Sequence, residues 1–267
     1  MTESTSQNWI EGWPDVQRRL LSRPRILLAL DFDGIIAPVA SRPEESRLPE
    51  DFRNLLSKLE ASPRIVLALI SGRSLVDLRT RVGLGNVIYA GNHGMEMEGA
   101  GFMSSDGLAS SCRCDLVDAL TFLSRCARRL RGVVIEDKGL SITIHWRLAL
   151  EKEREALAEL LEVITNNHPR LEIFPGDATW NIRGRASWDK CDAIGQMLDY
   201  LELASTDVLY LADGFTDERT FARLSAGLTF CVNSTALASA RYLVPTRMEV
   251  MQLLFSLLCA VNKASLS

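Results

Sequence analysis

Short apolar runs punctuate the first third of the chain, at Ile26–Leu30, Ile65–Ile70 and Val87–Ala90. These runs do not alternate apolar with polar positions, which is typical of strands buried on both faces of a parallel sheet. Between the first two runs, four apolar residues recur at the spacing of one helix face: Phe52, Leu55, Leu56 and Leu59. Strands that alternate with helices predict an α/β fold with a parallel sheet.

The same pattern returns near the end of the chain. Strands are predicted at Val208–Ala212, Leu228–Val232 and Tyr242–Val244, with helical patterns before and between them. The C-terminal stretch MQLLFSLLCAV is about half as long as a membrane-spanning helix, which needs roughly 20 residues. It therefore predicts a packed helix.

The middle of the chain has a different pattern. Strand-like runs at Gly132–Glu136 and Ser141–Trp146 flank the turn residues DKG, which predicts a β-hairpin. An amphipathic helix follows, whose apolar face carries Leu157, Leu160, Leu161 and Ile164. Two further strands are predicted at Leu171–Phe174 and Thr179–Arg183. These elements predict a small α+β module inserted into the α/β domain.

These patterns divide the chain into three parts. Residues 25–110 and 183–267 are expected to form the α/β core, and residues 111–182 the inserted module. Residues 1–24 are a polar N-terminal extension without the basic start and apolar centre of a signal peptide. Its two tryptophans could dock the extension on the core, or the extension could stay mobile.

The first apolar run leads directly into Asp31, Phe32, Asp33 and Gly34. Ligands of open parallel sheets bind outside the carboxyl ends of the strands, where these aspartates lie. Two carboxylates this close repel each other unless a cation compensates, and Mg²⁺ prefers such oxygen ligands. One carboxylate can attack phosphorus, and a second can move the proton of the leaving oxygen. The alternative is a strand-terminating turn, for which Asp and Gly are common.

Three further residues favour phosphate chemistry over a plain turn. Ser71 follows the second strand, where its hydroxyl can donate to a phosphate oxygen or cap the next helix. Lys190 begins a predicted helix, where a cation opposes the helix dipole but can bind phosphate. Asp213 follows a later strand and could complete a metal site or cap a turn. Together they predict a phosphoryl-transfer site with Mg²⁺ as its cofactor.

Composition and charge narrow the class of partner. The chain has 267 residues, 47% of them hydrophobic, and a formal net charge of −4. It has no basic stripe typical of nucleic-acid binding and no polybasic segment typical of a membrane surface, so we expect neither partner. The six cysteines include no CxxC pair, which indicates reduced cysteines in a cytoplasmic protein. The pattern does not specify an oligomeric state.

The ordered motifs resemble the haloacid dehalogenase superfamily of phosphotransferases, and more closely the trehalose-6-phosphate phosphatase family. The matching stretches read LDFDGIIAPV, LISGRSLVDL, YAGNHGMEMEG, IEDKGLSITIHWR, SWDKCDAI and ADGFTDERTF. The resemblance implies a Rossmann-like parallel-sheet core of haloacid dehalogenase type with an inserted α+β cap domain. It also implies Mg²⁺-dependent hydrolysis of a small-molecule sugar phosphate, trehalose 6-phosphate, through an aspartyl-phosphate intermediate.

The resemblance implies a role for each matching residue. Asp31 would be the nucleophile and a metal ligand, and Asp33 the general acid/base with its backbone carbonyl on the metal. Ser71 and Lys190 would hold the phosphoryl group, Asp213 would anchor Mg²⁺, and the inserted module would be a mobile cap. The residues implied in substrate binding or cap closure are Ser71, Gly72, Arg73, Asn92, His93, Glu96, Lys138, His145, Asn181 and Arg183.

The chain departs from the family pattern at three positions. Ile35 stands where the family has Thr, and Gly214 replaces the second aspartate of GDDxTDE. Asn181 replaces the Glu of the family's E-x-R-P motif, and an amide both donates and accepts, whereas an ionised Glu only accepts. Two alternatives therefore stay open: a phosphatase for a related glycosyl or pseudo-disaccharide phosphate, and a catalytically weak paralogue that binds a sugar phosphate. Lys138 and His145 could also be structural residues of the hairpin.

Overall fold

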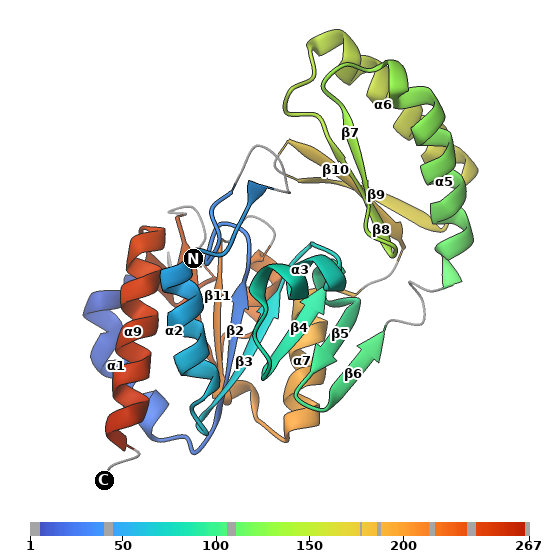
Figure 1. Cartoon of the computed structure of the whole chain (residues 1–267). Coiled ribbons are helices and arrows are strands. Elements are labelled where there is room, and N and C mark those ends of the chain that lie inside the picture. Colours follow the sequence, from blue (N-terminus) through green and yellow to red (C-terminus); the bar gives the residue numbers. More distant parts are fainter. Residues whose placement is uncertain are drawn as a thin grey trace, which may run out of the picture. The chain divides into compact units, whose positions relative to one another are not determined.

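The computed structural model describes residues 6–39, 45–105, 111–176, 178–185, 188–213, 217–233 and 239–264 (Figure 1). The chain divides into two compact units, which we call unit 1 (Met1–Ser104 and Asp189–Ser267) and unit 2 (Ser105–Trp188). Each unit has its own sheet and its own hydrophobic core.

Unit 1 is built on a sheet in which nine described strands follow the order β1-β13-β12-β11-β2-β3-β4-β5-β6. They are β1 (Gln7–Asn8), β2 (Ile26–Asp31), β3 (Ile65–Ile70), β4 (Val87–Gly91), β5 (Glu96–Gly99), β6 (Phe102–Ser105), β11 (Val208–Ala212), β12 (Leu228–Val232) and β13 (Tyr242–Val244). From β1 to β4 the neighbours pair in parallel, and β5 pairs antiparallel with β4. The predicted α/β fold with a parallel central sheet is confirmed.

Helices pack on this sheet and bury its central strands. They are α1 (Trp9–Leu21), α2 (Glu50–Glu60), α3 (Leu75–Val82), α7 (Lys190–Leu201), α8 (Glu218–Arg223) and α9 (Arg247–Ala264), with short 3-10 helices η2 (Asn92–Gly94) and η4 (Ser205–Asp207). Every residue of β2 and β3 is buried, which explains why both runs are apolar without alternation.

The N-terminal helix is docked on unit 1. Both α1 and α2 contact α9 (Figure 1). The buried Trp9 donates from its indole Nε1 to Glu249 Oε2 at 3.0 Å, and Val16 and Leu20 join the core. The N-terminal extension is therefore docked on the core through α1, rather than mobile there.

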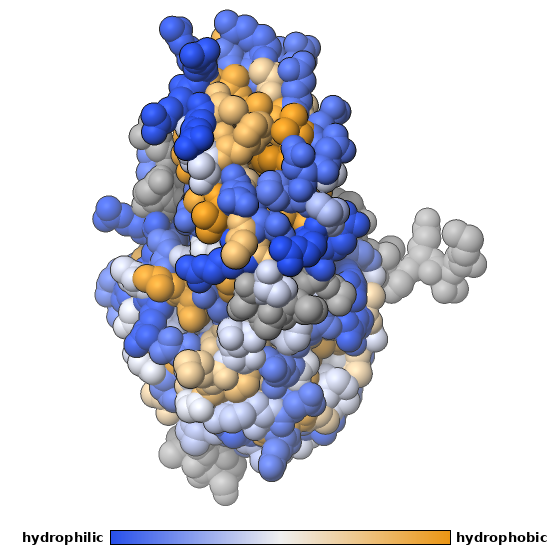
Figure 2. Space-filling model, turned by 90° about the vertical axis from the view of Figure 1, so that its right-hand side faces the viewer, coloured by the Kyte–Doolittle hydropathy of each residue, from blue (hydrophilic) through white to orange (hydrophobic). Residues whose placement is uncertain are grey.

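Unit 2 is a four-stranded antiparallel sheet with helices on one face. Its strand order is β7-β8-β10-β9, and it contains β7 (Val134–Asp137), β8 (Ser141–His145), β9 (Leu171–Gly176), β10 (Thr179–Gly184), α5 (Arg113–Cys126), α6 (Glu151–Asn167) and η3 (Ala127–Arg129). Apolar residues of both helices and of the sheet form its core. On the outer surface of this unit, apolar side chains form a strip between hydrophilic ones (Figure 2).

The boundaries of unit 2 differ from those predicted for the inserted module. Strand β10 stays paired with β9 as far as Gly184, which lies opposite Leu171, so the unit continues past Ile182. Its other boundary lies at Ser105 rather than at residue 111. Within the described ranges, no helix combines the length and the hydrophobicity that a membrane span requires.

Candidate active site

The chain turns sharply at the carboxyl end of β2. Gly34 has φ = +81°, a conformation that L side chains rarely adopt, and its N–H donates to the Ala37 carbonyl at 2.8 Å. The Phe32 carbonyl accepts from the N–H groups of Ile36 and Ala37. Because Phe32 and Ile36 are buried in the core, this turn fixes the two aspartates at the strand end.

Lys190 connects Asp31 to a further carboxylate, that of Asp217. The Lys190 Nζ lies 2.8 Å from Asp31 Oδ2 and 3.0 Å from Asp217 Oδ1. All three side chains are buried, and that of Asp217 is 0% exposed. A cation at the start of a helix opposes the dipole, so these two carboxylates, and not the helix, account for the lysine at this position.

A capping box fixes the start of α7 and thereby the backbone of Lys190. The Asp189 side chain accepts from the N–H groups of Cys191 and Asp192, and the Asp192 side chain accepts from the N–H of Asp189. These bonds satisfy N–H groups that have no partner within the first turn. The lysine therefore starts from a rigid position.

Burial and charge act in opposite directions on the pKa of Asp31. Burial, together with the Asp217 and Asp213 carboxylates, raises the pKa of Asp31, whereas Lys190 lowers it; the net result is a rise from the ordinary 3.8 to about 7. Burial lowers the pKa of Lys190, but the Asp217 and Asp31 carboxylates raise it above its usual value. One lysine cannot neutralise three carboxylates, so an added cation would favour the ionised form of Asp31.

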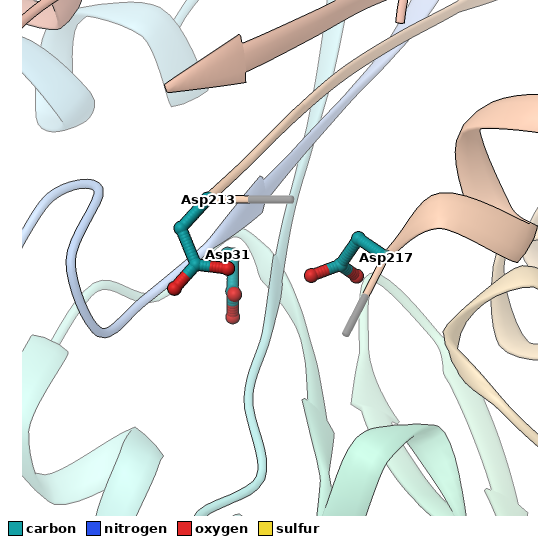
Figure 3. Close-up of side chains that lie close together, drawn as sticks. All are labelled: Asp31, Asp213 and Asp217. Carbon is teal, nitrogen blue, oxygen red and sulfur yellow. The ribbon is translucent and has the colours of Figure 1, made fainter. Parts of the chain in front are cut away.

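Three carboxylates form the acidic cluster of unit 1: Asp31, Asp213 and Asp217 (Figure 3). One oxygen atom from each lies within 4.8 Å of the others. Asp213 directly follows β11, and Asp217 directly precedes α8. Converging carboxylate oxygens are the ligands that Mg²⁺ prefers, so these residues fit a divalent cation.

Asp217 was not predicted from the sequence as a site residue. Its Oδ1 accepts from the hydroxyl of the buried Tyr210 at 2.5 Å, in addition to its contact with Lys190. An aspartate just before a helix is easily interpreted as an acid favoured by the helix dipole, which hides its part in the site. The sequence did contain a signal: Asp217 is the aspartate of TDE in the matching stretch ADGFTDERTF, and it lies four residues after Asp213.

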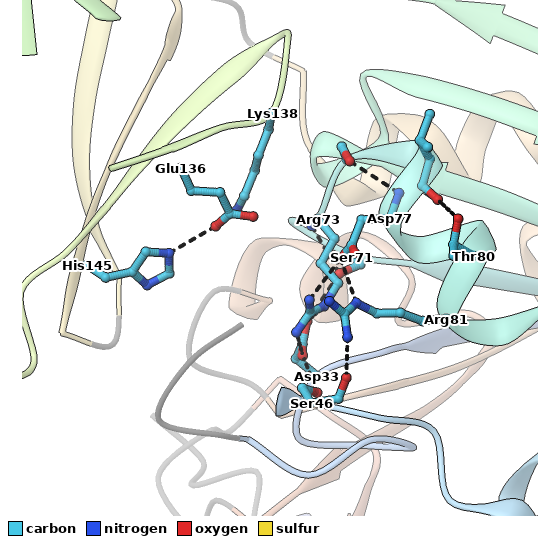
Figure 4. A network of polar contacts seen from close by, with 12 residues as sticks. Asp33, Ser46, Ser71, Arg73, Asp77, Thr80, Arg81, Glu136, Lys138 and His145 are labelled. Atoms are coloured by element: carbon cyan, nitrogen blue, oxygen red, sulfur yellow. Dashed lines mark hydrogen bonds and ion pairs between the residues drawn. The ribbon is translucent and has the colours of Figure 1, made fainter. Parts of the chain in front are cut away.

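Asp33 forms a bidentate ion pair with an arginine (Figure 4). Arg73 donates from Nε to Asp33 Oδ2 at 2.8 Å and from Nη2 to Asp33 Oδ1 at 2.7 Å. The Ser71 hydroxyl lies 3.4 Å from Asp33 Oδ2. The structure thus brings Ser71 and Arg73 to Asp33, and the predicted contact of Arg73 with substrate stays a prediction.

The GNHG stretch is bonded to the loop that carries Ser71. The N–H of Asn92 donates to the Arg73 carbonyl at 2.6 Å, and the N–H of His93 donates to the Ser71 carbonyl at 2.8 Å. A Cβ atom at Gly72 would lie 2.7 Å from the His93 ring, so this close approach requires glycine. The absence of a side chain at Gly72 therefore makes room for the His93 ring beside the loop that carries Ser71.

Asn92 and Glu96 bind each other inside unit 1. The Asn92 Nδ2 donates to Glu96 Oε1 at 2.7 Å, and the same oxygen accepts from the Leu75 N–H at the start of α3. Asn92 is 0% exposed. These contacts hold the loop in place, and a role of Asn92, His93 and Glu96 in sugar recognition stays a prediction.

In unit 2, predicted site residues share one face of the sheet. Residues directly opposite each other on paired strands face the same side, and the register places Thr143 opposite both Glu136 and Asn181. His145 and Arg183 lie two residues further along their strands, so they share this face. The opposite face carries the apolar residues that pack against α5 and α6.

Glu136 lies between two of the predicted residues (Figure 4). Its Oε2 lies 2.9 Å from His145 Nε2 and 3.7 Å from Lys138 Nζ. Glu136 was not predicted from the sequence, because a glutamate in a half-exposed strand is usually part of a solvated polar face. Carboxylate, imidazole and ammonium groups converge here, and together they can accept and donate hydrogen bonds.

Asn181 and Arg183 have partners within their own sheet. The Thr143 hydroxyl donates to Asn181 Oδ1 at 2.8 Å. The Arg183 Nε donates to Glu172 Oε1 at 2.5 Å, and its guanidinium lies 4.7 Å from the centroid of the Phe174 ring. These contacts fix both polar groups on the sheet face, where their roles in sugar binding stay predictions.

The family model described as trehalose-phosphatase matches residues 29–239 of the chain. The chain belongs to the trehalose-phosphatase family. It is 27% identical over 210 residues to trehalose-phosphate phosphatase B of Arabidopsis thaliana, a match that covers 74% of this chain and 55% of that protein. It is 28% identical over 253 residues to probable trehalose-phosphate phosphatase 4 of Oryza sativa subsp. japonica, covering 91% and 68%.

A solved structure of a trehalose-6-phosphate phosphatase related protein has the same fold. The TM-score is 0.79 at 21% sequence identity, and the match covers 89% of this chain and 99% of that chain. The match to the family model confirms the family resemblance expected from the motifs. The chain spans little more than half the length of the Arabidopsis relative.

The structure bears on two of the three departures from the trehalose-phosphatase pattern. Ile35 is 0% exposed and packs in the core of unit 1, so the position of the missing hydroxyl is occupied by buried apolar surface. Asn181 is bonded to Thr143 as described above. Gly214 lies outside the described residues.

Proposed function

We propose that this member of the trehalose-phosphatase family hydrolyses trehalose 6-phosphate to trehalose and inorganic phosphate. The observation that carries the proposal is the group formed by the buried Asp31, Lys190 and Asp217 and the half-buried Asp213 beside the ends of β2 and β11. It combines a carboxylate nucleophile, a fixed ammonium group and ligands for a divalent cation, which phosphoryl transfer requires. The names of the relatives support trehalose 6-phosphate as the substrate.

Asp31 is the nucleophile in this mechanism. A carboxylate oxygen of Asp31 attacks phosphorus, and the bond between phosphorus and the sugar oxygen breaks on the opposite side. Lys190 places positive charge beside the attacking group, and the Ser71 hydroxyl can donate to a phosphoryl oxygen. Mg²⁺ bound to Asp31, Asp213 and Asp217 would supply further neutralisation of the phosphoryl charge.

Asp33 moves the protons. It gives a proton to the leaving sugar oxygen, and later takes one from the water that attacks the aspartyl-phosphate. The second step releases phosphate and restores both aspartates to their starting forms. The Asp33 side chain is 37% exposed, so the carboxylate can meet a substrate while Arg73 holds it from behind.

Unit 2 is the cap in this proposal, and the sheet face opposite α5 and α6 recognises the sugar. Lys138, His145 and Glu136 converge there, and Asn181 and Arg183 lie on the same face. Hydroxyl groups of a disaccharide both donate and accept, which matches this mixture of charged and amide groups.

A phosphatase for a related disaccharide phosphate is the second candidate. Asn181 stands where the family has a glutamate, and its amide oxygen already accepts from Thr143. This position thus offers the sugar no carboxylate acceptor, and its amide oxygen is already bonded within the sheet. A sugar with a different arrangement of hydroxyl groups would then fit better.

The test is phosphate release from trehalose 6-phosphate, sucrose 6-phosphate and glucose 6-phosphate, each with Mg²⁺ and with EDTA. We expect Mg²⁺-dependent release from trehalose 6-phosphate. Release from another sugar phosphate alone would keep the chemistry and replace the substrate. Tight binding of one sugar phosphate without any release would favour a binding paralogue instead of an enzyme.

A further inference from the structure

Five residues of unit 1 close a ring of hydrogen bonds that includes the Asp33 carboxylate (Figure 4). Besides its two bonds to Asp33, Arg73 donates from Nη1 to Asp77 Oδ2 at 2.9 Å. The same oxygen accepts from Arg81 Nε at 2.7 Å. Arg81 Nη1 donates to the Ser46 carbonyl at 2.6 Å, and the Ser46 hydroxyl lies 3.1 Å from Asp33 Oδ1.

Two members of the ring that contact the Asp33 carboxylate are buried, whereas the Asp77 side chain is partly exposed. Arg73 is 6% exposed and Ser46 is 1% exposed. Burial raises the pKa of Asp77, but Arg81 and Arg73 lower it further, so the pKa of Asp77 lies below its ordinary value. Asp77 is therefore ionised at neutral pH and holds two guanidinium groups at once.

Asp77 connects segments that are distant in the sequence. Arg73 lies in the loop after β3, Ser46 follows the turn after β2, and Asp77 and Arg81 lie one turn apart on α3. Without the Asp77 charge, the guanidinium groups of Arg73 and Arg81 would repel each other across a largely buried space. Arg73 would then no longer be fixed on the far side from Asp33.

We propose that Asp77 is a positioning residue for the general acid: through Arg73 and Arg81, it fixes the Asp33 carboxylate in the orientation that meets the leaving sugar oxygen. This inference rests on the proposed function, since it assumes that Asp33 protonates the leaving group. It also assigns Arg73 to Asp33 rather than to the substrate.

The competing explanation is that Asp77 only stabilises α3. A negative charge in the first turn interacts favourably with the helix dipole, and the Asp77 N–H donates to the side chain of the N-cap residue Ser74. A purely structural role predicts that Asp77→Asn changes the amount of folded protein but not the chemistry of that protein.

The choice of leaving group separates the two explanations. A sugar oxygen needs a proton as its bond to phosphorus breaks, whereas the nitrophenolate of 4-nitrophenyl phosphate leaves without one. For Asp77→Asn we expect kcat on trehalose 6-phosphate to fall by about 10- to 100-fold, with the KM little changed. The first-turnover release of nitrophenolate should change by less than about threefold.

Glu98→Gln is the matched control. It removes the carboxylate partner of Arg79, another arginine of α3, in an exposed pair at 2.8 Å. We expect both reactions of this variant to match those of the wild type. A selective loss in Asp77→Asn but not in Glu98→Gln supports the positioning role, and equal losses on both substrates would overturn it.

The wild type tests the proposed function separately. If it releases phosphate from neither substrate, the proposed function fails, and a crystal structure of Asp77→Asn still decides the positioning. We expect Arg73 to lose at least one of its two bonds to Asp33 in that variant. An Asp33–Arg73 pair that keeps both bonds would overturn the inference whatever the activity.

Discussion

Asp31 links the protonation of the active site to the stability of the protein. Its pKa rises from 3.8 to about 7 on folding, so in this range the folded metal-free protein keeps a proton that the unfolded chain has released. Asp31 therefore contributes stability below about pH 4, and this contribution is lost as the pH rises to about 7.

We predict that Asp31→Asn removes this part of the pH dependence, because asparagine does not titrate. The measurement is the free energy of unfolding by urea in EDTA between about pH 3 and pH 8, a range that contains both the ordinary pKa of 3.8 and the folded-state pKa of about 7. Asp51→Asn, an exposed aspartate of α2, is the control and should keep the wild-type slope. An unchanged slope in Asp31→Asn would contradict the burial argument.

Tyr210 orients a carboxylate that we assign to the metal. Its buried hydroxyl donates to Asp217 Oδ1 at 2.5 Å. Loss of such an outer hydrogen bond typically weakens metal binding, so we predict that Tyr210→Phe lowers the Mg²⁺ affinity by about 10- to 100-fold. Calorimetric titration with Mg²⁺ measures it, and Tyr200→Phe, a half-exposed tyrosine of α7, should leave the affinity unchanged. Equal affinities in the two variants would count against Asp217 as a metal ligand.

At the residue scale, strand ends explain which site residues could be predicted. Asp31, Ser71 and Asp213 follow apolar strands, so the topology of a parallel sheet indicates their meeting place. Tyr210 and Asp77 could not be found in this way. A tyrosine within a strand is typical of a core, and an aspartate in the first turn is typical of any helix.

At the scale of elements, α7 carries the ammonium group into the site. Its start depends on the capping box of Asp189 and Asp192. We predict that Asp189→Ala lowers the free energy of unfolding by about 0.5–2 kcal/mol and reduces kcat, because the Lys190 backbone is no longer fixed. Urea denaturation and steady-state kinetics measure the two effects.

Asp199→Ala is the control for this prediction. Asp199 lies near the carboxyl end of the same helix, where a negative charge is unfavourable, so its removal should not destabilise the protein. Equal destabilisation by the two substitutions would show that the capping box does not specifically stabilise α7.

The central strands could be predicted from their long apolar runs, whereas the short strands near the sheet edges could not. The runs at Ile65–Ile70, Val208–Ala212, Leu228–Val232 and Tyr242–Val244 coincide with β3, β11, β12 and β13. By contrast, β1, β5 and β6 are short strands towards the edges of the sheet. The sequences of β1 and β6 show neither a long apolar run nor an alternation, and the alternation of Met and Glu at β5 covers only residues 95–98. Pairing with neighbouring strands, rather than the local pattern, therefore makes these segments strands.

At the scale of the whole molecule, two separate cores predict two separable stabilities. Ile144 is 0% exposed in the core of unit 2, and Leu254 is 0% exposed in that of unit 1. We predict that either residue changed to Ala costs about 2–5 kcal/mol and lowers the unfolding transition of its own unit only. Differential scanning calorimetry measures this, and one common transition that both variants lower equally would show a single cooperative unit.

The central claim is that Asp31 is the nucleophile of a trehalose 6-phosphate phosphatase. The most direct measurement is the rate of phosphate release from trehalose 6-phosphate with Mg²⁺, for the wild type, Asp31→Asn and the surface control Asp51→Asn. We predict full activity in the control and a loss of roughly 10⁴-fold or more in Asp31→Asn, with the fold retained. Activity of Asp31→Asn within about tenfold of the wild type would contradict the claim.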